Sequence, residues 1–250
     1  MNSSDNSKIR VLRDKKAVAE FAVNTWIELS TASVAEKGMF TVALSGGRTP
    51  VDFYQHLASC PHPLPWDRTH IFFADERFVP PDDNLSNYRM INEQLLSHIP
   101  IPKKNIHPMM TEGVSLEESA KQYEADMRIF FKIGDNDTPV FDLIILGIGE
   151  DGHTASLFPE GDFLQETKRL AIPVIADASP SERVSLSLGV INNAKNICFL
   201  VTGANKAEAI KTILEDKAST LPAAQVKPTQ GILLFLLNKT AASLLSNKES

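Results

Sequence analysis

Cysteine is scarce in this sequence. Only two cysteines occur among 250 residues, Cys60 and Cys198, and they stand far apart, each beside apolar neighbours. Two cysteines cannot build a disulfide scaffold, and their spacing does not match that of a zinc site. We therefore expect both to be buried free thiols in a protein that works in a reducing compartment.

The sequence also lacks a long apolar run. No segment approaches the roughly 18 apolar residues of a membrane-spanning helix. The polar N-terminus, MNSSDNSK, has no apolar region of the kind found in secretion signals. Hydrophobic residues nevertheless make up 43% of the chain, which is ordinary for a globular protein with a core. These features predict a cytoplasmic protein that does not attach to a membrane.

Positive charge is not in excess either. The chain has 25 lysines and arginines against 31 acidic residues, and its formal net charge is −6. Nucleic acids and anionic membranes are held mainly by clustered lysine and arginine, and no basic stripe occurs here. We therefore expect neither as a partner. A small anionic substrate stays open, provided that a few cations converge locally.

What the sequence does contain is a regular alternation of apolar runs and amphipathic segments. Such alternation predicts a parallel sheet covered by helices. The expected strands span 39–44, 70–74, 141–146, 183–188, 197–202 and 232–237, and the expected helices span 14–35, 87–99, 115–133 and 205–215, with one more beginning at 49. We expect an α/β fold with a doubly wound, mainly parallel sheet and helices on both faces. It forms a single domain over 8–250, after a disordered tail over 1–7.

Ligands of open parallel sheets bind beyond the carboxyl ends of the strands, and the first unusual segment lies there. It runs through Ser45, Gly46, Gly47, Arg48 and Thr49, between an expected strand and an expected helix. The glycines let backbone N–H groups point at an anion, and the helix N-terminus adds partial positive charge. Two hydroxyl groups and a guanidinium supply further donors. The segment favours phosphate binding, and a tight turn with a helix cap is the alternative.

A second segment, Asp75-Glu76-Arg77, closes an expected strand. Charged side chains avoid burial unless they are paired, so three of them at the mouth of a buried strand are unusual as packing residues. Asp75 and Arg77 are therefore candidate catalytic residues. An aspartate–arginine ion pair that only fixes the loop is the alternative. Residues 86–88, Ser-Asn-Tyr, are expected to cap the next helix and can also line the cleft.

A third segment, residues 147–159, contains a formal G-x-G-x-x-G pattern directly after a buried strand. A dinucleotide site is not expected, because Glu150 and Asp151 would place negative charge where a pyrophosphate should lie. Pro159 would also end the helix that such a site requires almost as it begins. The glycines instead indicate a sharp loop that presents Asp151 and His153. A histidine in this place, two residues from an aspartate, indicates acid–base chemistry.

Two cations complete the set of candidates. Arg183 opens an expected strand, and Lys206 lies in the first turn of an expected helix. A cation there opposes the helix dipole, and a bound anion would give it a reason. A doubly wound sheet can bring both cations to one cleft, facing the Gly46-Gly47 loop. A solvated surface lysine is the alternative for Lys206.

These segments, in this order, resemble the 6-phosphogluconolactonases of the superfamily that includes the glucosamine-6-phosphate deaminases. The resemblance covers nearly the whole chain, to residues 221–226, and its most specific part is residues 149–159, Gly-Glu-Asp-Gly-His-Thr-Ala-Ser-Leu-Phe-Pro. It implies a modified Rossmann-like fold and hydrolysis of 6-phospho-D-glucono-1,5-lactone to 6-phosphogluconate, in the oxidative pentose phosphate pathway. It also implies His153 as general base and phosphate contacts from the Gly46-Gly47 loop, Arg183 and Lys206. Arg48 stands where many relatives have serine, and Glu150 receives no role.

In this interpretation His153 takes a proton from the water that attacks C1 and then returns it to the ring oxygen. Asp151 or Asp75 orients the imidazole. Arg77 stabilises the oxyanion, or it pairs with an acid and only shapes the pocket. The chain has no G-x-S-x-G or H-E-x-x-H motif, so neither a covalent serine nor a zinc ion is expected. We expect no cofactor, no metal, and a monomer or weak homodimer.

Two rival functions share the resemblance. An amino-sugar-phosphate deaminase or isomerase would use Asp75 as base, but such relatives carry an acid five residues beyond the histidine, where this chain has Phe158. A non-catalytic sugar-phosphate sensor usually carries a separate DNA-binding segment, and the residues before the fold are too few to form one. The lactonase is therefore favoured.

Overall fold

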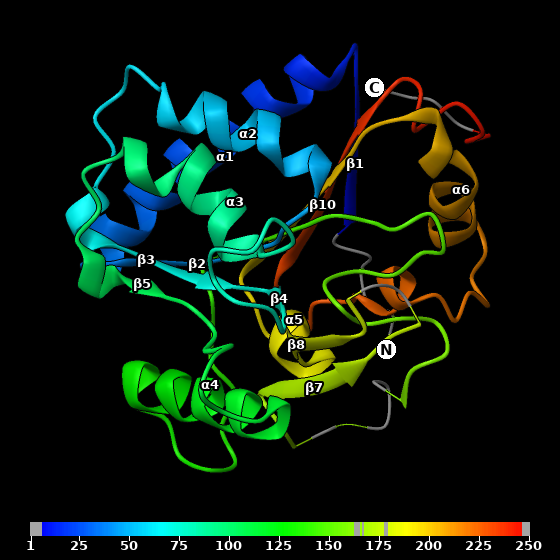
Figure 1. Ribbon diagram of the computed structural model, residues 1–250. Helices are drawn as coiled ribbons and strands as arrows, with labels where there is room; N and C mark the ends of the chain where they lie inside the picture. The colour runs from blue at the N-terminus through cyan, green and yellow to red at the C-terminus, as the bar shows by residue number, and fades with distance from the viewer. Residues whose placement is uncertain (1–6, 163–165, 167, 178–179, 247–250) are drawn as a thin grey trace.

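The structure is a computed structural model that describes residues 7–162, 166, 168–177 and 180–246. Its centre is a sheet in the order β1-β10-β9-β6-β2-β3-β5, in which all neighbouring strands run parallel (Figure 1). The strands are β1 (Ser7–Leu12), β2 (Phe40–Leu44), β3 (Thr69–Phe73), β5 (Ile106–His107), β6 (Leu143–Leu146), β9 (Asn196–Val201) and β10 (Ile232–Asn238). The predicted α/β class and the predominance of parallel strands are confirmed.

Helices cover both faces of this sheet. In Figure 1, α1, α2 and α3 lie above β2 and β3, and α4 lies below them. The helices are α1 (Lys15–Lys37), α2 (Arg48–Ala58), α3 (Asn87–Gln94), α4 (Leu116–Phe131), α5 (Leu188–Asn192) and α6 (Ala207–Glu215), with short 3-10 turns before or after several of them. The Asp14 side chain caps α1 by accepting a hydrogen bond from the Ala17 N–H, and Gly38, with φ of 80°, ends it.

A second, smaller sheet of antiparallel strands was not expected. It consists of β4 (Asp75–Arg77), β8 (Glu182–Leu186) and β7 (Ala171–Ile175), with β8 in the middle. Ala74 joins the two sheets, because its N–H donates to the Leu44 carbonyl in the main sheet while its carbonyl accepts from the Leu186 N–H. The chain thus leaves the main sheet after β3, and the predicted strand that carries Arg183 belongs to the smaller sheet.

Two further expectations need correction. The tail does not extend over 1–7, because Ser7 already pairs with Leu233 at the start of β1; residues 1–6 lie outside the described residues. Cys198 is buried as predicted, but Cys60 is only half-buried. The strand β1 was missed because only its pairing with β10 identifies it as a strand. Its six residues alternate between exposed and partly buried positions, which is too short a pattern to predict a strand from the sequence.

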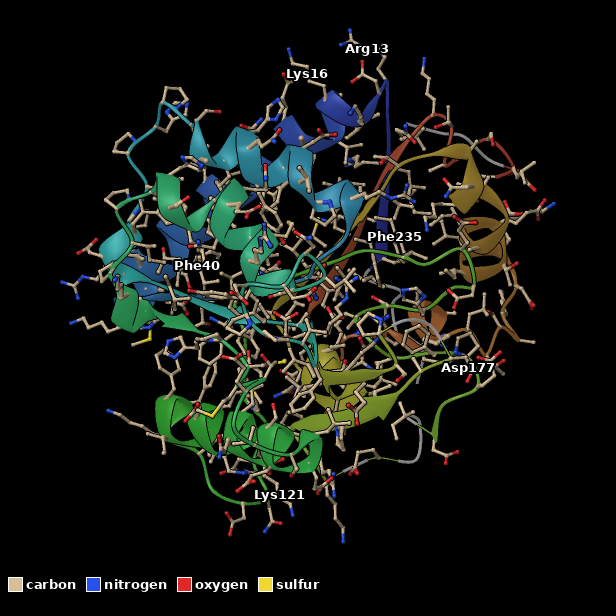
Figure 2. The ribbon with its side chains drawn as sticks, in the orientation of Figure 1. Arg13, Lys16, Phe40, Lys121, Asp177 and Phe235 are labelled. Atoms are coloured by element: carbon tan, nitrogen blue, oxygen red, sulfur yellow. The ribbon has the colours of Figure 1, made fainter. Side chains whose placement is uncertain are left out.

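The core fills the space between the main sheet and its helices. Trp26 on α1 is fully buried and packs edge-on against Phe40 of β2, with 5.2 Å between the ring centroids. Figure 2 shows Phe40 and Phe235 inside the molecule, whereas Arg13, Lys16 and Lys121 extend outward. Within the described part of the chain, no helix combines the length and the apolar character that a membrane crossing requires.

Candidate functional site

A cavity of about 520 Å³ opens where β2, β3, β6 and β9 end, next to the smaller sheet. Nearly all residues singled out from the sequence line it: Ser45, Gly46, Gly47, Arg48, Thr49, Asp75, Arg77, His153, Arg183 and Lys206. Asp151 contacts His153 just beside the cavity. The fold therefore brings segments from four different parts of the chain to one place, as expected for the carboxyl edge of a parallel sheet.

The glycine loop presents the N-terminus of α2 to this cavity. Gly47 is the N-cap residue, with φ of 101°, and it has no side chain that could accept a hydrogen bond from the first turn. The first N–H groups of α2 therefore have no capping side chain, and the positive end of the helix dipole faces the cavity. Arg48 and Thr49 begin the helix there. This arrangement suits an anion such as a phosphate.

The imidazole of His153 is held by the neighbouring aspartate. Its Nδ1 lies 2.6 Å from Asp151 Oδ1, and the same oxygen accepts the His153 backbone N–H at 3.1 Å. Partial burial raises the pKa of Asp151, but the bonds from His153 outweigh it and the pKa lies below its ordinary value. An ionised carboxylate only accepts hydrogen bonds, so Nδ1 carries a proton and Nε2 keeps its lone pair when the ring is neutral.

Gly149 makes this contact possible. A Cβ at this position would lie 2.1 Å from His153 Nδ1 and 2.3 Å from Asp151 Oδ1, closer than any side chain allows. The loop folds back tightly, because the Gly149 N–H donates to the His153 carbonyl, and Gly152 turns the chain with φ of 83°. The glycines of the G-x-G-x-x-G pattern thus build a turn that carries an aspartate–histidine pair, and no helix follows directly.

The carboxylates of the second segment have separate partners. Asp75 Oδ2 accepts a hydrogen bond from the buried Ser156 hydroxyl at 2.7 Å, and no ion pair joins Asp75 to Arg77 among the described residues. Glu76 points elsewhere and caps α3, accepting from the Asn87 and Tyr88 N–H groups at 2.7 Å each. Burial raises the pKa of Glu76 to about 7, although these donors and the Arg77 N–H oppose the rise.

Lys206 and Arg48 form one group of positive charge at the cavity. Burial lowers the pKa of Lys206 and the charge of Arg48 adds to this, whereas Glu150 and Asp151 raise it. Glu150 accepts a hydrogen bond from Asn205, the residue before Lys206, at 2.6 Å. Glu150, for which no role was expected, therefore links the loop that carries Asp151 and His153 to the segment that carries Lys206.

Arg183 belongs to a different group. It lies directly opposite Arg77 in the register of β8 and β4. Its guanidinium carbon sits 5.4 Å from the centre of the Phe158 ring, and that ring is 4.7 Å from the His153 ring, centre to centre. The expected contact of Arg183 with a substrate phosphate stays a prediction; the structure shows that Arg183 lies beside Arg77 in the smaller sheet and lines the same cavity as Lys206.

Unpartnered polar atoms concentrate at this cavity. Buried polar atoms are normally hydrogen-bonded, and the few exceptions mark functional or strained sites. Among the buried side-chain atoms that lack a partner in the described structure, four belong to residues lining the cavity: Ser45 Oγ, Arg77 Nε, Asn87 Oδ1 and Arg183 Nε. Sequence reasoning considered Phe158 only as the residue that replaces an acid, and it missed the contact of Ser156 with Asp75, although both residues stand in the most specific segment.

The chain is similar to known proteins both in sequence and in fold. The sequence model of the family described as glucosamine-6-phosphate isomerases/6-phosphogluconolactonase matches residues 13–235. The chain belongs to this family. It is 39% identical to the 6-phosphogluconolactonase of Synechocystis sp. over 95% of the chain and 98% of that protein. The structure of the 6-phosphogluconolactonase from Trypanosoma brucei aligns with a TM-score of 0.87 at 30% identity, covering 96% of this chain and 99% of that one.

The fold by itself does not separate the two activities in the family name. A monomeric glucosamine-6-phosphate deaminase aligns over 95% of this chain and 99% of its own, with a TM-score of 0.80 but only 22% identity. At that level of identity the likeness concerns the fold alone. The side chains around His153 therefore have to decide which chemistry the site supports.

Proposed function

We propose that this protein hydrolyses 6-phospho-D-glucono-1,5-lactone to 6-phosphogluconate, with His153 as general base. The observation that carries the proposal is the aspartate-bound imidazole at a cavity lined with cations and an open helix N-terminus. A phosphorylated lactone needs both features, because the phosphate requires cations and donors while the ester requires only an activated water. Membership in the family and the names of its relatives support the same reaction.

The proposed chemistry needs one base. His153 Nε2 takes a proton from water as the water oxygen bonds to C1 of the lactone, which gives a tetrahedral intermediate with a negative oxygen. The C1–O5 bond then breaks, and the imidazolium returns the proton to O5, which becomes the C5 hydroxyl group. The new carboxylic acid ionises. Asp151 keeps the proton on Nδ1 and stabilises the imidazolium through the 2.6 Å contact.

We assign the phosphate to the N-terminus of α2 together with Arg48 and Lys206. The first-turn N–H groups and these two side chains lie at the same end of the cavity. A phosphate dianion there would offset the mutual repulsion of the two cations. It would also give a reason for a lysine at the start of α6, where the helix dipole disfavours a positive charge.

Phe158 favours hydrolysis over amino-sugar isomerisation. The aromatic ring lies where the deaminase-like pattern requires an acid, and it packs against the His153 ring. A phenyl ring cannot exchange protons with a substrate, so the acid that would assist ring opening is missing from this place. Asp75, the base in that alternative, is held by the Ser156 hydroxyl.

Side-by-side product analysis tests the proposal. The protein is given freshly made 6-phosphogluconolactone and, separately, glucosamine 6-phosphate, and spontaneous lactone hydrolysis is subtracted. We expect accelerated formation of 6-phosphogluconate and no ammonia from the amino sugar. Ammonia release would favour the deaminase, and binding without turnover of either compound would favour the sensor. His153→Ala serves as the control that separates catalysis by this site from a contaminating lactonase.

A further inference from the structure

The register of the smaller sheet forces two positive charges together. Arg77 on β4 and Arg183 on β8 are directly opposite each other, and both line the cavity. Directly opposed side chains on antiparallel strands have Cβ atoms about 5 Å apart, and like charges in this arrangement destabilise the sheet. Arg183 is also 93% buried. Burial lowers its pKa, and the charge of Arg77 lowers it further, while Asp75 opposes both.

Within the described residues, only the charge of Asp75 favours the Arg183 cation, and it forms no ion pair with it. No carboxylate lies within ion-pair distance of either guanidinium in that part of the chain. Arg77 donates one hydrogen bond, from Nη1 to the Leu85 carbonyl, and the buried Nε atoms of both arginines lack acceptors. The Oδ2 atom of Asp75 accepts a hydrogen bond from the Ser156 hydroxyl instead. Buried N–H donors without acceptors are costly, so the pair is suited to an anion that enters the cavity.

The arginine pair is separate from the cations assigned to the phosphate. Arg48 and Lys206 follow strands of the main sheet, whereas the arginine pair belongs to the smaller sheet. His153 lies near both groups of cations. The Phe158 ring contacts both the His153 ring and the Arg183 guanidinium. Asp151, which is hydrogen-bonded to His153, raises the pKa of Lys206 by its charge. The reacting carbon, which must lie near His153, is thus placed close to the arginine pair.

We propose that Arg77 and Arg183 form a second anion subsite, which binds the C1 carboxylate of the product. The inference rests on the proposed function. The lactone carries negative charge only at its phosphate, whereas 6-phosphogluconate carries it at both ends. The subsite therefore binds the product more tightly than a ligand with a neutral C1. The tightly bound product therefore inhibits the enzyme. During the reaction the subsite also binds the oxygen on C1 that becomes negative as water attacks.

Binding titrations with three probes test this subsite. The probes are 6-phosphogluconate, glucitol 6-phosphate, which has a neutral CH₂OH at C1, and gluconate, which lacks the phosphate. We expect Arg183→Gln to weaken 6-phosphogluconate binding at least tenfold and glucitol 6-phosphate binding less than twofold, with Arg77→Gln acting in the same direction. Lys206→Gln should weaken both phosphorylated probes to a similar degree and leave gluconate nearly unchanged. Arg68→Gln, in the 3-10 turn just before β3, removes the same charge from the exposed surface and controls for the overall field.

The outcomes are distinct. Equal losses on both phosphorylated probes would make Arg183 a phosphate ligand and overturn the inference, as would unchanged binding of 6-phosphogluconate. Should Arg183→Gln not fold, Arg183→Lys keeps the charge but not the two-pronged geometry, and it should still weaken only the probes with a carboxylate. Lactone hydrolysis by the wild type is measured in parallel. If it is absent, the proposed function fails; if it is present and the losses are equal, only the subsite fails.

Discussion

The carboxamide of Asn87 lies directly against Gly46. A Cβ on Gly46 would be 1.7 Å from Asn87 Oδ1 and 2.3 Å from its Cγ. The other end of the amide is fixed, because Nδ2 donates to the Asp75 carbonyl at 2.9 Å. Asn87 thus ties the first residue of the smaller sheet to the glycine loop. Gly46 is required by this packing and not by its backbone, since its φ is not positive.

This contact predicts a specific suppression. Gly46→Ala should lower the free energy of unfolding by about 1–3 kcal/mol, as overpacking does, and should also reduce kcat/KM by displacing the loop. Asn87→Ala removes the clashing amide, so the double variant should lose less stability than the two single variants added together. Urea unfolding measures all four proteins. Gly147→Ala is the matched control, because a Cβ there meets nothing within 4 Å although the residue lines the same cavity. Additive losses would show that the contact is not rigid.

The histidine loop predicts two different losses. His153→Ala should lower kcat by about 10²-fold or more while the protein stays folded, as expected when a general base is removed. Asp151→Asn should also lower kcat, since a neutral amide no longer stabilises the imidazolium that forms during the reaction. Rates corrected for spontaneous hydrolysis test both, and a folded His153→Ala protein with full kcat would remove the residue from the mechanism.

The sequence predicted the inner strands of the main sheet because most of their residues are buried, whereas it missed the edge strands β1 and β5, which have no fully buried residue. β2 and β6 consist wholly of buried residues, and uninterrupted apolar runs of this kind need no tertiary information to be recognised. The smaller sheet was missed because β4 has three charged residues and β7 contains Pro173; pairing with β8 alone makes them strands. Their tertiary context overrides weak local propensity.

The same division applies to the site. Chain order predicted which loops meet, because the carboxyl ends of parallel strands share one edge. The position of Arg183 could not be predicted in this way, since its strand is antiparallel and lies outside that edge. The choice between Asp75 and Asp151 as partner of His153 likewise depends on side-chain geometry. In the structure Asp151 Oδ1 lies 2.6 Å from His153 Nδ1, whereas Asp75 accepts a hydrogen bond from Ser156.

Lys206→Ala should act on phosphate recognition. A contact to a remote phosphate is made alike in the ground and transition states, so KM should rise at least about tenfold while kcat changes less. Gluconolactone without the phosphate should be a poor substrate and nearly indifferent to the substitution. Steady-state kinetics on both lactones check this. Equal loss of efficiency on the two would show that Lys206 does not bind the phosphate, and Arg48 would become the leading candidate.

Chelation should leave the activity intact. The proposed mechanism uses a free imidazole, and the described residues contain no cluster of three or more His, Cys, Asp or Glu side chains that could hold a metal ion. Rates before and after exhaustive dialysis against a chelator test this. Loss of activity that returns with a particular added metal, and with no other, would contradict the metal-free mechanism.

A histidine pair away from the cavity predicts how stability depends on pH. His70 Nδ1 lies 3.2 Å from His107 Nε2 between β3 and β5, and the His107 ring stacks on Phe72 with 4.1 Å between centroids. Burial and, to a lesser degree, the charge of His70 together lower the pKa of His107 to about 4. Burial likewise lowers the pKa of His70. Both rings therefore resist protonation in the folded state.

The direction in which stability changes with pH follows from proton binding. An unfolded histidine has its ordinary pKa of about 6.5, so between pH 6.5 and 4 the unfolded chain binds more protons than the folded one. The stability is fully present above this window and is lost as pH falls through it. His107→Gln should therefore be less stable at pH 7.5, through the lost ring stacking, yet lose less stability than the wild type on going to pH 4.5. Urea unfolding at both pH values measures this, with the exposed His62→Gln as control. Parallel pH profiles for His107→Gln and the wild type would show that His107 is not the group responsible.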